Sequence, residues 1–384
     1  SQKIDRNKLK VMGTRWGADA VALHKSTSIF GNLVALEESP IKAELLYAGT
    51  DDGLIHRTTD LKSWSKFSSF TGVPVGTYVN DILCDGFDES TVYAVFNNHK
   101  NGDFKPYILK SKDQGSSWES ISGDLPERGS VYCLAQDHEN KDLLFAGTEF
   151  GVFFTTDGGK KWTKIGGGLP TIAIRDIEIQ KRENDLVLAS FGRGFYVLDD
   201  YSPLRTMADT ANTSTHIFPI KDALVFNVTN PLGTSGKSSQ GESFFTTPNP
   251  PIGATFRYFL NEKPQTLEDQ RRKAEKKIRK DKGDVDYPDY EDLKKEDLEL
   301  KPYLVFEIKD KDGHVISRYK EEKVSKGINQ SIWDFRLEST TPVQLKEEEV
   351  GRYSSPDWGA LAMPGEYSVT IHQFLNGKLT ALAG

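Results

Sequence analysis

The first 200 residues contain short segments in which apolar and polar residues alternate. Four of them open a repeated pattern: GNLVALEE at 31–38, YVNDILCD at 78–85, SVYCLAQD at 130–137 and IAIRDIEI at 172–179. Alternation with a period of two is typical of strands, because successive side chains point to opposite faces of a sheet. The pattern therefore predicts four strands, each with a face that can pack on a neighbouring sheet.

A pair of further strands follows each of these segments. The pairs occupy 45–58, 91–111, 143–155 and 186–198, and the longest turn within a pair lies at 97–106. Short apolar runs bounded by turn residues are typical of strands. Each module therefore begins with strand, loop, strand, tight turn and strand.

A polar turn that ends in tryptophan follows three of the pairs. Two of these turns, SKDQGSSW (111–118) and TTDGGKKW (155–162), match at four positions. The third, TTDLKSW (58–64), lacks the glycine and is one residue shorter. Aspartate accepts backbone N–H bonds within a turn, glycine permits positive φ, and tryptophan covers a hairpin. We assign structural rather than catalytic roles to the matching residues, which are Ser111, Asp113, Gly115, Trp118, Thr155, Asp157, Gly159 and Trp162.

The complete module recurs roughly every 40 to 55 residues, a period typical of four-stranded propeller blades. Four modules lie at about 29–72, 78–123, 130–169 and 172–200, and the fourth reads YVLDDYSPL in place of an Asp turn. The fold class expected for this half of the chain is an all-β propeller with Asp-turn hairpins.

The second half has a different pattern. Asp312-Gly313 and Asn376-Gly377 are hairpin signals between strand-like segments, and Pro364-Gly365 marks another turn. Short strands with such turns predict a small β-sandwich. Residues 262–301 interrupt this sandwich with a charged helix. The capping-box pair Thr266 and Asp269 marks its start, and Gly283 marks its end. The helix is basic and the segment after it acidic, so we expect the two to neutralise each other in solvent.

These patterns divide the chain into four segments. Residues 1–28 are an N-terminal extension or part of a preceding blade, and 29–202 hold the four modules. Residues 203–253 form a linker and closing strand, and 254–384 form the sandwich with its helical insertion.

Composition adds three constraints. The net charge of -7 argues against a nucleic-acid partner, and no apolar run is long enough to span a membrane. Cys84 and Cys133 lie in alternating apolar segments, which favours buried free thiols over a disulfide or a reactive site. The chain begins with Ser and shows no signal peptide, so its N-terminus does not indicate a location.

No motif for metal or cofactor chemistry is present. The seven histidines lack zinc spacing, and the sequence contains no Cys-x-x-Cys, Gly-x-Ser-x-Gly or calcium-loop pattern. The segment DKDGH at 310–314 is explained by its hairpin. We therefore expect no metal and no cofactor. Glycoside hydrolysis would need two carboxylates across a cleft, a distance that the sequence does not give.

The Ser/Thr-x-Asp-x-Gly-x-x-Trp turns are similar to the Asp-box, or bacterial neuraminidase repeat, of sialidases, xyloglucanase-type hydrolases and sortilin-type propellers. Longer segments, among them YAGTDDGLI, GTEFGVFFT and LASFGRGFYVLDDYSPL, resemble secreted bacterial sortilin-like or glycosyl-hydrolase-like repeat proteins. The resemblance covers nearly the whole chain. It implies an upstream propeller region as a partner, an immunoglobulin-like C-terminal domain, and a secreted, periplasmic or cell-surface location.

In these families the Asp-box joins strands three and four, and function lies on the opposite face. That face carries the turns between strands two and three and the connections between blades. We expect a peptide, protein or glycan ligand there; glycoside hydrolysis between two propellers and a structural scaffold remain alternatives. The candidates, which could also be ordinary turn or salt-bridge residues, are Asp51, Asp52, Asn80, Asp81, His99, Glu149, Arg175, Asp176 and Arg193.

Overall fold

The structure is a computed structural model that describes residues 31–227, 249–340 and 359–384, together with residues 8, 10, 13–17, 19 and 20. The chain divides into two compact units, Ser1–Ala208 and Asp209–Gly384, and each is described by itself. The expected N-terminal extension lies outside the described residues except for those few positions. Strands dominate both units, which confirms the all-β prediction.

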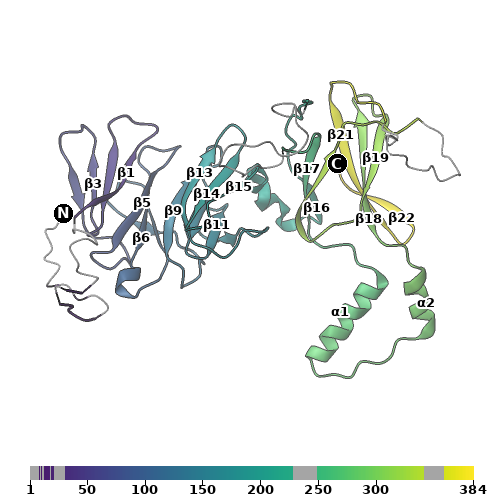
Figure 1. The fold of residues 1–384 in the computed structure, drawn as a ribbon, viewed down its shortest axis with the longest axis horizontal. Helices are drawn as coiled ribbons and strands as arrows, with labels where there is room; N and C mark the ends of the chain where they lie inside the picture. Colours follow the sequence, from purple (N-terminus) through teal and green to yellow (C-terminus); the bar gives the residue numbers. More distant parts are fainter. Residues whose placement is uncertain are drawn as a thin grey trace, which may run out of the picture. The chain divides into compact units, whose positions relative to one another are not determined.

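Four antiparallel sheets follow one another along the first unit, in chain order (Figure 1). We call them blades 1 to 4. Blade 1 consists of β1 (Leu33–Glu38), β2 (Leu46–Thr50), β3 (Ile55–Thr58) and β4 (Ser65–Phe67). Blade 2 consists of β5 (Tyr78–Cys84), β6 (Val92–Asn97), β7 (Tyr107–Ser111) and β8 (Glu119–Ser120). Blade 3 consists of β9 (Val131–Gln136), β10 (Leu144–Thr148), β11 (Gly151–Thr155) and β12 (Thr163–Lys164).

Blade 4 has three strands: β13 (Ile174–Gln180), β14 (Asp185–Ser190) and β15 (Phe195–Leu198). The missing Asp turn explains the missing fourth strand, because that turn connects strands three and four in the other blades. The chain instead enters a 3-10 helix, Ser202–Asn212, whose first turn packs Tyr201 and Leu204 against the interface of blades 3 and 4.

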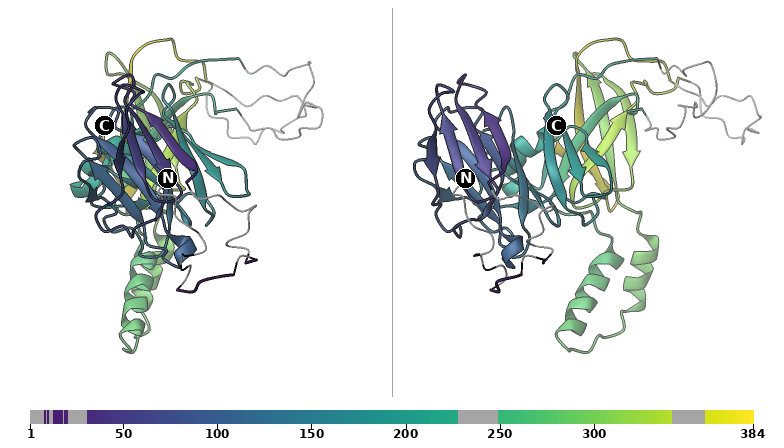
Figure 2. Two further views of the ribbon diagram at one scale, coloured as in Figure 1. Left: turned by 90° about the vertical axis from the view of Figure 1, so that its left-hand side faces the viewer. Right: turned by 60° about the vertical axis from the view of Figure 1, so that its left-hand side comes forward.

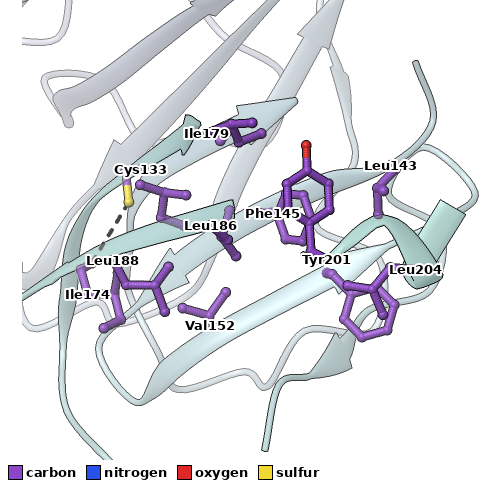
Figure 3. Packing of buried hydrophobic residues seen from close by; sticks show 13 residues of the cluster. Cys133, Leu143, Phe145, Val152, Ile174, Ile179, Leu186, Leu188, Tyr201 and Leu204 are labelled. Carbon is purple, nitrogen blue, oxygen red and sulfur yellow. Dashed lines mark hydrogen bonds between the residues drawn. The ribbon is translucent and has the colours of Figure 1, made fainter. Parts of the chain in front are cut away.

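Apolar side chains fill the space between successive blades, as the alternating pattern requires. Between blades 3 and 4, Phe145 and Val152 of one sheet meet Ile174 and Leu188 of the other, and all are fully or nearly fully buried (Figure 3). Equivalent clusters join blades 1 and 2 and blades 2 and 3. The sheets therefore stack face to face, which is the arrangement of propeller blades.

The second unit is a sandwich of two antiparallel sheets (Figure 2). One sheet has the order β16 (Thr215–Ile217), β17 (Ala254–Leu260), β20 (Gly327–Trp333). The other has the order β19 (Val315–Glu321), β18 (Tyr303–Asp310), β21 (Tyr367–Leu375), β22 (Lys378–Ala383). The turns at Asp312-Gly313 and Asn376-Gly377 lie between paired strands, as predicted. Within the expected linker, Thr215–Ile217 proves to be an edge strand of the sandwich.

The helical insertion contains two helices rather than the one that the sequence predicts. α1 (Leu267–Lys280) begins with the predicted capping box of Thr266 and Asp269. The acidic return segment forms α2 (Tyr290–Leu298), which lies beside α1 (Figure 1). Arg271 joins them with two bonds to Glu296, of 2.7 and 2.8 Å, so the predicted pairing of basic and acidic segments is confirmed.

The end of α1 differs in detail from the sequence prediction. The helix ends at Lys280, and Lys282 rather than Gly283 adopts the left-handed conformation, with φ of 60°. Gly283 donates its backbone N–H to the carbonyl of Ile278 and so closes the last turn. In the described part of the chain, no helix has the length and apolar character needed to cross a membrane.

Candidate functional site

Strand register places the Asp turns and the turns between strands two and three at opposite edges of each blade. In blade 1, Leu33 pairs with Thr50 beside the turn between strands two and three. At the other end Leu46 pairs with both Glu38 and Thr58, and Thr58 begins the Asp turn. We call the first edge the binding face candidate, and the second the Asp-turn edge.

The Asp turn of blade 2 is closed by its own side chains. Asp113 accepts hydrogen bonds from the hydroxyls of Ser111 (2.8 Å) and Ser117 (2.6 Å) and from the Ser117 backbone N–H (2.8 Å). These bonds, the Ser117 hydroxyl first, lower the pKa of Asp113 to about 2. Gly115, at φ of 89°, donates to Ser111, and Trp118 donates its ring N–H to the Gly115 carbonyl. The acceptor capacity of Asp113 is therefore directed into the turn.

The other two Asp turns repeat this geometry. Asp157 accepts from Thr155 and from the N–H groups of Lys160 and Lys161, while Gly159 donates to Thr155. In blade 1 Asp60 makes equivalent bonds without the glycine. Trp118 and Trp162 are buried against the preceding blade, whereas the side chain of Trp64 in blade 1 is 46% exposed. The aspartate role thus does not depend on the glycine, whereas the tryptophan is buried only in the two turns that contain it.

Replacing Asp113 by alanine tests this structural role. Three hydrogen bonds that hold the turn would be lost, so we expect the unfolding temperature to fall by about 2–4 °C with ligand binding unchanged. Thermal unfolding and a binding titration on the same sample measure both. Lys112→Ala is the control, because its exposed pair with Glu119 should contribute little. A D113A protein that unfolds like the wild type but has lost binding would contradict the structural assignment.

Each blade carries a β-bulge in its first strand, near the binding face candidate. Register shifts place the extra residue at Val34, Asn80, Tyr132 and Arg175 in blades 1 to 4. A bulge turns one side chain out of the regular alternation and is common beside functional sites. The four bulged residues therefore lie at equivalent positions along one edge, where Arg175 is exposed, Val34 and Asn80 are half-buried and Tyr132 is buried.

Three of the bulged residues touch across the blades. The amide of Asn80 donates to the carbonyl oxygen of Tyr132 at 2.6 Å. The Arg175 guanidinium carbon lies 3.8 Å from the centre of the Tyr132 ring and 5.1 Å from that of Phe191. One continuous row thus crosses three blades and consists of Asn80 in blade 2, Tyr132 in blade 3 and Arg175 in blade 4. We call it the bulge row.

Exposed aromatic side chains lie on loops at the same edge. Phe104 between β6 and β7, Phe150 between β10 and β11, and Phe191 between β14 and β15 are 41%, 46% and 66% exposed. Backbone bonds fix these loops to first strands: Gly129 donates to Phe104, Glu149 to Ser130, and Phe191 to Ala173. The rings are therefore presented on ordered turns.

Asp51 and Asp52 serve the fold of blade 1. Asp51 accepts from the backbone N–H groups of Gly31 (2.6 Å) and Asn32 (2.9 Å), and so holds the chain entering β1. Asp52 is fully buried and accepts from the Thr50 hydroxyl at 2.6 Å. Both carboxylates are therefore engaged within blade 1 and not directed to the binding face candidate. They are ordinary turn residues, the alternative that the sequence left open for them.

Asp81 and Asp176 follow the bulges of blades 2 and 4 and occupy equivalent positions. Asp81 accepts from the Leu134 backbone N–H of blade 3 at 2.9 Å. Burial raises the pKa of Asp81 to about 7, with Glu37 and Asp176 adding to the shift and the hydrogen bonds opposing it. Asp176 is exposed and accepts from the N–H of Ile177. Asp81 is thus an inter-blade contact, and Asp176 is its uncovered counterpart.

His99 and Glu149 lie within the electrostatic field of the bulge row. Burial and the charges of Lys100 and Arg175 lower the pKa of His99, while the charge of Glu149 acts in the opposite direction. Burial raises the pKa of Tyr132, with Arg175 opposing the shift and Glu149 adding to it. The His99 ring nitrogen Nδ1 lies 2.6 Å from the side-chain oxygen of Asn97. These candidates therefore share the environment of Tyr132.

The remaining candidates give a mixed result. Arg193 is exposed on the turn between β14 and β15. Cys84 and Cys133 are buried free thiols, as predicted, and the Cys133 sulfur faces the Ile174 carbonyl at 4.0 Å (Figure 3).

In the second unit Asp310, Asp312 and His314 lie close enough to share an ion, but Asp310 already accepts two backbone N–H groups of its own turn. That cluster is explained by the hairpin.

A hollow of about 610 Å³ lies in the second unit, beside residues of β17, α1, β21 and β22. It is open, and its lining includes Leu260, Gln270 and Gln373, none of which the sequence indicated. The bulge row therefore remains the better candidate site, because it combines fixed charge, aromatic surface and repeated geometry.

Sequence reasoning missed Tyr132 and the phenylalanines Phe104, Phe150 and Phe191. Tyr132 lies in the apolar segment SVYCLAQD, and its side chain is buried, so nothing in the sequence marks it as the ring over which Arg175 lies. An alignment of the four first strands on their bulges would have shown Tyr132 opposite Asn80 and Arg175. The bulge itself, however, depends on how the first strand pairs with its partner strand, where two residues oppose one. Alternation within one strand does not reveal this pairing.

Two xyloglucanases are similar to this chain in sequence. The enzyme of Hypocrea jecorina is 25% identical over 180 residues, which are 42% of this chain and 21% of the enzyme. The enzyme of a Paenibacillus species is 27% identical over 135 residues, 32% of this chain and 13% of that protein. The chain thus spans about a fifth or less of the length of these relatives. No protein-family model matches the chain.

Solved structures with similar geometry include the GH74 xyloglucanase of Xanthomonas campestris. It shares 16% identity and a TM-score of 0.36, covering 50% of this chain and 33% of that one. The propeller assignment itself rests on the stacked blades and their register described above.

Proposed function

We propose that the protein binds a glycan at the binding face candidate, opposite the Asp-box turns. The observation that carries this proposal is the row of exposed rings, Phe104, Phe150 and Phe191, beside the bulge row. Aromatic faces supply apolar contact area at low entropic cost, and nearby polar groups give orientation. The relationship to xyloglucanases supports a glycan over a peptide or protein ligand.

Calorimetric titration with soluble xyloglucan and with polygalacturonate tests the proposal. We expect saturable binding of at least one of them, and about tenfold weaker binding in Phe150→Ala and in Phe191→Ala. Trp64→Ala is the matched control, because Trp64 is as exposed as Phe150 but lies at the Asp-turn edge. Binding that is absent, or that Trp64→Ala weakens as strongly, would overturn the proposal.

Glycoside hydrolysis is the second candidate, and only the sequence relationship to xyloglucanases favours it. Of the five candidate acids, Asp51, Asp52 and Asp81 are engaged in structural hydrogen bonds, which leaves Glu149 and Asp176. Release of reducing ends from the same polysaccharides, abolished in Asp176→Asn or Glu149→Gln, would replace the binding-only assignment by an enzymatic one.

We further propose that upstream blades of a longer, extracellular propeller cover the two end faces. Phe195 and Val197 of blade 4 occupy positions equivalent to Val152 and Phe154 of blade 3. The blade 3 residues are 0% and 7% exposed, because blade 4 covers them, whereas Phe195 and Val197 are 76% and 56% exposed. At the other end Leu36 is 59% exposed, although its counterpart in blade 2 is buried.

The exposed end faces predict self-association of the 384-residue chain when it is studied alone. Contiguous exposed apolar surface favours association. Light scattering across a concentration series should show a rising mean mass, and Phe195→Asp should reduce it. A wild-type chain that remains monomeric at high concentration would contradict the need for a covering blade.

A further inference from the structure

The Arg175 side chain is held by aromatic rings rather than by an acid. Its guanidinium lies over Tyr132 at 3.8 Å and near Phe191 at 5.1 Å, measured from Cζ to each ring centre. The residue is exposed, and no acidic side chain in the described ranges forms an ion pair with it. A cation at the binding face candidate is therefore fixed in place while its N–H groups remain available.

The local structure orients this guanidinium before any ligand arrives. A bulge in β13 directs Arg175 to the face, and the hydrogen bond from Asn80 to the Tyr132 carbonyl fixes the strand on which the ring lies. Stacking occupies the flat faces of a guanidinium and leaves its planar N–H edge free, which matches a carboxylate with two parallel bonds. Less conformational entropy is then lost on binding.

Neighbouring groups suit a ligand that has hydroxyls as well as an acid. Glu149 lies close enough for its charge to act on both Tyr132 and His99, and it offers acceptor oxygens on the same face. Phe150 follows Glu149 directly and exposes its ring. A sugar ring that carries a carboxylate has the corresponding parts: hydroxyl donors, an apolar face and an anion.

We propose that Arg175 binds the carboxylate of a uronic acid residue, so that acidic glycans are the preferred ligands of this face. This inference rests on the proposed glycan binding and adds its charge selectivity. Phe150 and Phe191 contribute apolar contact, while Arg175 distinguishes a carboxylate from a neutral sugar.

Titration of the full chain with tetragalacturonate and with its methyl ester tests the selectivity. We expect the acid to bind about tenfold or more tightly than the ester, with salt weakening only the acid. Arg175→Gln should remove the difference, and Arg175→Lys should restore only part of it, since lysine lacks the planar fork. Arg182→Gln is the control, because Arg182 is an exposed arginine of blade 4 that pairs with Glu183.

Unchanged unfolding temperatures, expected for an exposed residue, would show that the variants are folded. Equal binding of acid and ester by the wild type, or a preference that survives Arg175→Gln, would overturn the uronate assignment and leave glycan binding standing. If the wild type binds neither tetragalacturonate nor its methyl ester, and also binds neither xyloglucan nor polygalacturonate, the proposed glycan binding is overturned as well. A peptide that binds through its free carboxylate, and not as its amide, would also overturn the assignment.

Discussion

Replacing Asp137 by asparagine should lower the free energy of unfolding by about 3 kcal/mol. Asp137 directly follows β9 and is fully buried; it accepts two bonds from Arg205, at 2.9 and 2.7 Å, and one from Tyr201 at 2.6 Å. Burial alone would raise its pKa, but these bonds lower it. Removal of the charge leaves the largely buried Arg205 side chain with weaker partners, which is the costly half of a broken pair.

Chemical denaturation at pH 7 measures the effect, and Glu139→Gln provides the matched control. Glu139 contacts the same guanidinium at 2.7 Å, but its side chain is 57% exposed, so we expect a loss below about 1 kcal/mol. Equal losses in the two variants would contradict the importance of the buried carboxylate.

The same pair has a defined pH dependence. A carboxyl group whose pKa is lowered in the folded state stabilises the protein above its unfolded pKa of about 4. That contribution is lost as the pH falls through the lowered folded pKa. The difference in stability between wild type and Asp137→Asn should therefore be constant from pH 5 to 7 and shrink below about pH 4.

Replacing Phe306 by alanine should destabilise the sandwich by about 3–5 kcal/mol. Phe306 is fully buried in β18, parallel to Tyr319 at 5.1 Å and to Phe256 at 6.0 Å between ring centres. Its removal leaves a cavity where both sheets meet. Because the Phe306 cluster lies within the second unit, calorimetry should show one lowered transition and an unchanged propeller transition.

Tyr287→Ala is the control for this experiment, because the Tyr287 side chain is 88% exposed in the helical insertion. It should leave both transitions unchanged. A Phe306→Ala protein in which both transitions fall together would show that the two units unfold as one.

Local signals explain how much of the fold was predictable. Asp113 and Asp157 make their bonds within four residues, so spacing alone identified their turns. Alternation located the first strands because their buried side chains pack against neighbouring blades. The second helix, Tyr290–Leu298, was missed because it buries no side chain and so leaves no apolar stripe.

The site was predictable only in part, because it depends on contacts between blades. Asn80, Arg175 and Glu149 were identified from their place in the topology, and the structure brings them around Tyr132. Asp51 and Asp52 looked equally suitable in sequence, yet buried hydrogen bonds engage them. Whether an acid caps a turn or faces solvent is decided by neighbours far along the chain.

The titration of the 384-residue chain with polygalacturonate, compared between Phe150→Ala and Trp64→Ala, is the most direct test of the central claim. If the face opposite the Asp turns binds glycans, Phe150→Ala weakens binding about tenfold and Trp64→Ala leaves it unchanged. Equal effects of the two variants, or no binding of polygalacturonate and xyloglucan by the wild type, would contradict it.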